Sequence, residues 1–109
     1  MEINTRTADD VTVIDISGSL DTQTSGTASE EMARIAQGAT KMLLNLECLD
    51  FLSSAGLRVI LRTAKQLSGS GGTIKICNAT GVVKEVMEIS GFGSLLDLHG
   101  TEADALASF

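Results

Sequence analysis

A short apolar run followed by a helical pattern marks the middle of the chain. Residues 42–46 are apolar except for Asn45, which is typical of a strand covered on both faces. From Leu57 to Leu67 apolar residues recur at spacings of three and four, so they line one side of a helix. Between these segments lie Ser53 and Ser54, and a serine hydroxyl before a helix can accept a hydrogen bond from an unpaired N–H of the first turn. The pattern therefore predicts a buried strand and a helix capped by at least one serine.

The N-terminal segment predicts a β-hairpin. β-Branched residues dominate 11–17, which indicates a strand, and residues 2–5 give a shorter one. Asp9 and Asp10 lie between them, and aspartate is common in turns because its side chain bonds the local backbone.

A first helix is expected after the polar connection at residues 18–26. Thr27 and Glu30 have the spacing of a capping box, and Gly38 is a suitable residue to end the helix, although its start could lie as early as Thr24. The apolar residues expected to face the core of this helix are Ala28, Met32, Ile35 and Ala36.

The Ser-Gly-rich run at 68–72 is expected to end the central helix and form a turn. A phosphate-binding loop would precede a helix, whereas this run precedes 73–77, which alternates like a strand. Asn78 or Thr80 can then cap a third helix that ends at Gly91. Its expected inward residues are Val82, Val83, Val86 and Met87.

The C-terminal segment predicts two short elements. Leu95–Leu98 indicates an edge strand, and Thr101 with Asp104 has the spacing that caps a small terminal helix. Strands that alternate with helices after an initial hairpin favour a mixed, mostly parallel sheet with helices packed on it. We therefore expect a single α/β domain over residues 1–109, with four to five strands and about four helices.

Composition and charge argue against several functions. A formal net charge of −6 disfavours general nucleic-acid binding, and the three aromatic residues, all Phe, give few stacking surfaces. No apolar run is long enough to span a membrane and no signal peptide is evident, so we expect a soluble cytoplasmic protein. Cys48 and Cys77 are expected to be reduced thiols that behave as small hydrophobic residues.

Catalytic and metal-binding patterns are sparse. A Ser-His-Asp triad would depend on Ser54 and the single histidine, His99, and no Gly-x-Ser-x-Gly elbow surrounds either central serine. One histidine and two distant cysteines fit no zinc pattern, and no EF-hand is present. We therefore expect neither enzyme activity nor a metal or other cofactor.

The two adjacent serines leave two interpretations open. A helix start needs one cap, and its partial positive charge also tolerates an anion, including a phosphate attached to serine. The residues alone favour the cap over a functional serine. They likewise favour a turn or capping role for Asp21.

Residues 45–61 carry a family resemblance. Asn45-Leu-Glu and Phe51-Leu-Ser-Ser-Ala-Gly-Leu-Arg-Val-Ile-Leu resemble the signature of bacterial anti-sigma factor antagonists, founding members of the STAS domain family. In that family an Asp-Ser-Ser/Thr-Gly-Leu sequence opens a helix, and its first serine is phosphorylated by a partner kinase. Ser54 matches that serine, while Ser53 stands at the usual aspartate and Ala55 at the second hydroxyl.

A second motif agrees with the first. Gly18, Leu20 and Asp21 match a Gly-x-Leu-Asp motif whose aspartate, in the family, lies near the phosphorylated serine. The resemblance spans nearly the whole chain. It implies a STAS fold and a partner-binding surface made of Asp21, Thr22, Ser53, Ser54, Ala55, Gly56, Leu57 and Arg58.

The resemblance implies a switch in which phosphorylation of Ser54 controls protein binding. The unmodified chain would bind an anti-sigma factor serine kinase, a histidine-kinase-like ATPase, and so free a sigma factor. A serine phosphatase would reverse the modification, and no direct contact with nucleic acid or membrane is implied. The alternatives are a STAS scaffold or sensor that binds a protein or small ligand without phosphorylation, and a hydrolase acting through Ser54.

Overall fold

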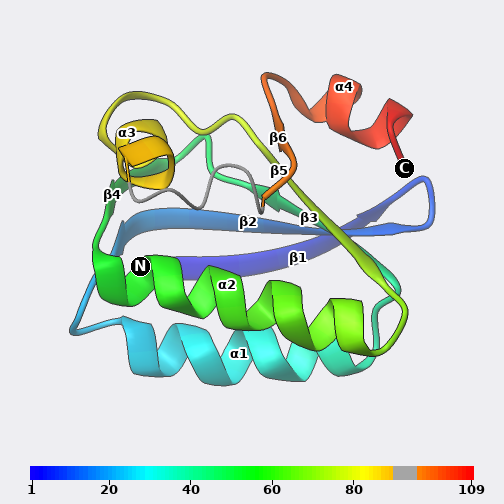
Figure 1. Cartoon of the computed structure of the whole chain (residues 1–109), viewed down its shortest axis with the longest axis horizontal. Coiled ribbons are helices and arrows are strands. Elements are labelled where there is room, and N and C mark those ends of the chain that lie inside the picture. The colour runs from blue at the N-terminus through cyan, green and yellow to red at the C-terminus, as the bar shows by residue number, and fades with distance from the viewer. Residues whose placement is uncertain (90–95) are drawn as a thin grey trace.

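The computed structural model describes residues 1–89 and 96–109, and the strands within them form one mixed sheet (Figure 1). The strands are β1 (Glu2–Ala8), β2 (Val11–Leu20), β3 (Lys41–Asn45), β4 (Leu49–Leu52), β5 (Thr73–Cys77) and β6 (Leu98–His99). The sheet order is β1-β2-β3-β5-β6, and β4 pairs with the end of β2. Only β1 and β2 pair antiparallel among these strands. The predicted fold class is therefore confirmed, with β4 as an additional strand.

The predicted hairpin is confirmed and is longer than expected. Asp9 and Asp10 both have positive φ, at 50° and 61°, as the two central residues of a tight hairpin turn require. Register then pairs Ala8 with Val11 and continues to Glu2 opposite Ser17.

Helices cover both faces of the sheet. The helices are α1 (Ser25–Gln37), α2 (Ser54–Gly69), α3 (Gly81–Ile89) and α4 (Glu102–Ala107). Figure 1 shows α1 and α2 side by side on one face and α4 on the other. Ile14 and Leu44 belong to the larger core, whereas their chain neighbours Val13 and Leu43 belong to a smaller core with Ala105 of α4. This alternation explains why β2 and β3 are apolar on both sides.

The predicted capping box of the first helix is wrong. The helix begins at Ser25 after Thr24, which was the earlier of the two expected starts, so Thr27 lies inside it. The reason is Asp21, whose side chain accepts hydrogen bonds from the N–H groups of Gln23 and Thr24 and forms the turn that starts the helix. Ala28, Met32 and Ala36 are buried as predicted, whereas Ile35 is only partly buried.

Two expectations for α3 also need correction. Asn78 does not cap it: the residue has φ of 60° and its side-chain amide donates to Asn45. Thr80 directly precedes the helix instead, and its carbonyl accepts from Lys84. Val82 is 50% exposed, because Val83 and Met87 define the buried side. The predicted end at Gly91 lies outside the described residues.

The C-terminal elements follow the prediction in part. The terminal helix is confirmed, with the Thr101 hydroxyl accepting from the N–H of Asp104 at 3.1 Å. The edge strand is limited to Leu98–His99 within the described residues, and Leu95 lies outside them. None of the described helices has the length and apolar character that crossing a bilayer requires.

Candidate functional site

Ser53 is the cap of α2. Its backbone is extended, and its hydroxyl accepts a hydrogen bond from the N–H of Gly56 at 3.1 Å. The N–H of Ser53 in turn donates to the carbonyl of Leu20 at 2.9 Å, which joins the helix start to the end of β2. The sequence-based prediction of a serine cap is confirmed, and the structure assigns it to the first of the two serines.

Ser54 has no comparable structural role. It is the first residue of α2 and its side chain is exposed. Within the described part of the chain, no hydrogen bond engages its hydroxyl. Backbone N–H groups of the first turn give this end of the helix a partial positive charge. The site therefore presents a free hydroxyl where an added anion would be stabilised.

Gly56 and Leu57 hold the helix start against the sheet. A Cβ atom at Gly56 would lie 2.5 Å from the carbonyl oxygen of Leu20 and 2.9 Å from Cδ1 of Leu52, so only glycine permits this approach. Leu57 is 2% exposed and belongs to the larger core. Within the expected partner-binding set, Gly56 and Leu57 are therefore buried beneath the surface.

Asp21 and Thr22 lie at the same edge of the sheet. Oδ1 of Asp21 accepts from the N–H groups of Gln23 and Thr24 at 3.0 and 3.1 Å, so the turn role predicted from the residues is confirmed. Thr22 is exposed. Because Leu20 is bonded to Ser53, the loop that follows β2 starts beside α2. No hydrogen bond links Asp21 to Ser54 among the described residues.

Ala55 and Arg58 line a groove between the first turns of α1 and α2. Its volume is about 350 Å³, and its other lining residues include Ser25, Ser29 and Arg62. Sequence reasoning missed these three, because the pairing of two helices is not visible in the pattern of either helix alone. An exposed arginine one turn after Arg58 was the available signal.

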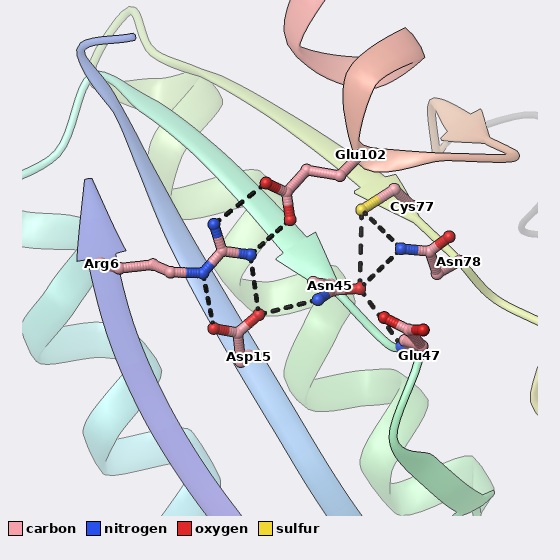
Figure 2. Close-up of polar contacts among 7 residues, drawn as sticks. All are labelled: Arg6, Asp15, Asn45, Glu47, Cys77, Asn78 and Glu102. Atoms are coloured by element: carbon pink, nitrogen blue, oxygen red, sulfur yellow. Dashed lines mark hydrogen bonds and ion pairs between the residues drawn. The ribbon is translucent and has the colours of Figure 1, made fainter. Parts of the chain in front are cut away.

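The opposite face of the sheet carries a second polar cluster, which sequence reasoning missed (Figure 2). Arg6 lies between two carboxylates, with Nε 2.8 Å from Asp15 and Nη1 3.0 Å from Glu102. Asn45 donates to Asp15 at 2.8 Å and accepts from Asn78 at 2.9 Å. Hydrogen bonds from Arg6 lower the pKa of both carboxyl groups. The cluster fastens α4 to the hairpin, and it had no sequence signal because its members come from five separate segments.

The single histidine lies far along the chain from the serine site and has other partners. His99 Nε2 is 3.0 Å from Asp97 and 3.3 Å from the hydroxyl of Ser108. Both contacts use the same ring nitrogen, whereas a catalytic triad uses one nitrogen for each partner. No cluster of three candidate metal ligands occurs within residues 1–89 and 96–109.

The two cysteines differ in environment. Cys77 is buried in the smaller core, and burial raises its pKa to about 11, which suits the predicted role of a small hydrophobic residue. Cys48 is exposed and does not fit that role.

The family comparison covers nearly the whole chain. The family model described as STAS domain matches residues 2–105. The chain belongs to the STAS domain family. The family that the two sequence motifs indicated is therefore confirmed.

Two curated STAS relatives carry regulatory names. BtrV of Bordetella bronchiseptica, provisionally named an anti-sigma factor antagonist, is 41% identical over 81 residues, covering 74% of this chain and 70% of BtrV. The anti-sigma F factor antagonist of Paenibacillus polymyxa is 30% identical over 98 residues, covering 88% of this chain and 84% of that protein.

Solved structures show the same fold. An anti-sigma factor antagonist from Mycobacterium paratuberculosis matches with a TM-score of 0.90 at 21% identity, covering 98% of this chain and 92% of that one. The anti-sigma factor antagonist SpoIIAA in its unphosphorylated form gives 0.76 at 23% identity, covering 96% and 93%. The phosphorylated form of SpoIIAA, a Bacillus protein, gives 0.73 at 23% identity and covers 98% of both chains.

Proposed function

We propose that this STAS domain is an anti-sigma factor antagonist switched by phosphorylation of Ser54. The unmodified form binds an anti-sigma factor serine kinase, a histidine-kinase-like ATPase, and thereby releases a sigma factor in the cytoplasm. Phosphorylation by that kinase ends the interaction, and a serine phosphatase restores it. The names of the relatives support the antagonist role.

One structural observation carries the proposal: Ser53 takes the capping role, and Ser54 remains exposed at the helix start. If Ser54 were the cap, modification would remove a bond that stabilises α2. Instead a phosphate can be added beside a satisfied cap, at the end of the helix that favours negative charge. The two solved forms of SpoIIAA support this by analogy, since one fold exists with and without phosphate.

The phosphate would act on the surface. It adds about −1.5 to −2 charges and three acceptor oxygens at neutral pH. Asp21 and Thr22 follow Leu20, which is bonded to Ser53, and Ala55 and Arg58 belong to the first turns of α2. A partner seated there would meet both the new charge and the new bulk. Binding would weaken while the core stays unchanged.

Complex formation with the kinase tests this proposal. The kinase is the histidine-kinase-like ATPase encoded nearest to this chain's gene, and binding is measured by calorimetry with a non-hydrolysable ATP analogue. Wild type and Ser54→Ala should bind similarly, whereas Ser54→Glu should bind at least about tenfold more weakly, the scale expected for a charge placed against a partner. Equal binding of all three would contradict phosphate control and leave the scaffold or sensor alternative.

The hydrolase alternative has a separate test. A serine-reactive fluorophosphonate should leave the intact mass of the wild-type chain unchanged under the proposed function. A stoichiometric adduct that Ser54→Ala abolishes would support the hydrolase instead.

A further inference from the structure

The positive charges of this acidic chain are distributed unequally. The chain has eight Lys and Arg residues against fourteen Asp and Glu, and the structure describes all eight. Five of them form ion pairs with carboxylates, namely Arg6, Arg34, Lys41, Lys75 and Lys84. Within the described residues the remaining three, Arg58, Arg62 and Lys65, have no ion pair, and all three lie on α2.

These three residues form a stripe. Their spacings of four and then three residues place them on one side of the helix, and all are exposed. We call Arg58, Arg62 and Lys65 the basic stripe. It begins in the second turn of α2, the helix that lies beside α1 in Figure 1.

The groove beside α1 extends this surface. Arg58 and Arg62 line the groove of about 350 Å³ together with the hydroxyl-bearing residues Ser25 and Ser29. Glu30 is the one carboxylate that lines it, and it forms no ion pair with either arginine among the described residues. The Ser25 hydroxyl already donates to the carbonyl of Thr22 at 3.3 Å. The groove therefore offers two unpaired guanidinium groups, which bind carboxylates.

The stripe begins one helical turn from the modification site. Ser54 and Arg58 are four residues apart on α2, and residues at this spacing are neighbours on one side of a helix. A phosphate on Ser54 would compete for Arg58 and would repel any carboxylate bound along the stripe. A basic partner surface would instead be attracted by the phosphate, which is the opposite of the proposed switch.

We infer that the basic stripe docks an acidic segment of the protein that binds at Ser54. This inference rests on the proposed function and adds the charge and position of the partner's contact surface. Three exposed cations on a chain of net charge −6 are too few for a nucleic-acid surface, so the occupant is a protein segment rich in Asp and Glu.

Matched charge reversals test the inference. Arg62→Glu with Lys65→Glu changes the stripe, and Arg34→Glu with Lys84→Glu makes the same change of net charge on α1 and α3, so it is the control. Arg58 stays unaltered because it adjoins Ser54. Binding to the same histidine-kinase-like ATPase is measured at low and at high salt, and circular dichroism melts check that each variant folds.

The stripe variant should bind about tenfold or more weakly at low salt and lose most of the salt dependence, whereas the control should stay within about twofold of wild type. Equal affinities for the two variants, or tighter binding by the stripe variant, would overturn the inference. If Ser54 is still phosphorylated in that case, the proposed function stands and only the docking role of the basic stripe is wrong. If the wild-type chain neither binds the kinase nor is phosphorylated, both the inference and the proposed function are wrong.

A labelled single-stranded oligonucleotide is the second probe. We expect no binding by wild type at physiological salt. Binding that the stripe variant alone abolishes would overturn the assignment to an acidic protein segment.

Discussion

The backbone N–H of Ser53 donates a hydrogen bond to the carbonyl of Leu20 at 2.9 Å, which fixes the start of α2 against the end of β2. Asp21 follows Leu20 and Ser54 follows Ser53, so this one bond brings the two family motifs to a common edge of the sheet. Asp21 is committed to its own loop and Ser53 to the cap. Of the two serines, only Ser54 has a hydroxyl that no hydrogen bond engages within the described residues.

Close packing at Gly56 predicts a large effect of a small substitution. In Gly56→Ala the new Cβ would meet the Leu20 carbonyl at 2.5 Å, so the helix start must move, and we expect a loss of about 1–3 kcal/mol in the free energy of unfolding. Gly26→Ala in α1 is the matched control, because its Cβ meets nothing within 4 Å. That control should be neutral or slightly stabilising. Urea denaturation measures both, and equal midpoints would contradict the close approach.

The unequal roles of the two serines predict unequal stabilities. Ser53→Ala removes the bond to Gly56 and should cost about 1 kcal/mol in the free energy of unfolding. Ser54→Ala removes an exposed hydroxyl and should change that free energy by less than about 0.5 kcal/mol. Thermal melts of the two variants provide the measurement. A larger loss for Ser54→Ala than for Ser53→Ala would show that Ser54, and not Ser53, caps α2.

The Arg6 cluster predicts a dependence of stability on acid. Arg6 lowers the pKa of Asp15 and Glu102 in the folded chain. As pH falls, the unfolded chain therefore takes up protons at a higher pH than the folded chain does. The stabilisation is therefore present above the usual carboxyl pKa of about 4 and is lost as pH falls through the lower folded values. Arg6→Met should lose about 1 kcal/mol at neutral pH, a value reduced for partial exposure, and should approach wild type in acid.

The matched control for this cluster is Arg34→Met, which removes an exposed pair with Glu31 within α1. Urea midpoints between pH 7 and pH 2 compare the two variants, where the pH limits are roughly those that bracket carboxyl titration. If the Arg6 and Arg34 variants follow parallel pH curves, the cluster does not couple α4 to the hairpin.

Phosphorylation is expected to stabilise the fold. A phosphate on Ser54 would meet the positive end of α2 and would lie four residues before Arg58, and both effects favour the helix. We expect the free energy of unfolding to rise by about 0.5–2 kcal/mol, with a smaller rise in Arg58→Ala. Melts of the chain before and after kinase treatment measure it. A lower melting temperature after phosphorylation would show that the modification disrupts α2.

Much of this fold was predictable because its patterns are local. The turn at Asp9-Asp10, a serine cap before Leu57 and the Thr101 cap of α4 each depend on a few adjacent residues. β4 was missed because its four residues alternate poorly, with Asp50 and Phe51 both exposed. Its strand character comes from pairing with β2, which one sequence cannot reveal.

The candidate site was predictable only in part. The family resemblance selected Ser54, but the residues alone could not decide which serine caps the helix. That choice depends on the bond between Ser53 and Leu20, which joins distant parts of the chain. The basic stripe and the Arg6 cluster were missed for the same reason, since they are recognised only when ion pairs across the whole fold are known.

The most direct test of the central claim is the position of the phosphate. The purified chain is incubated with the kinase and ATP, and intact-mass measurement followed by peptide fragmentation locates the modification. We predict one phosphoryl group on Ser54 in the wild type and none on Ser54→Ala. A phosphate on Ser53 or Thr22, or an unmodified chain beside an active kinase, would contradict the account.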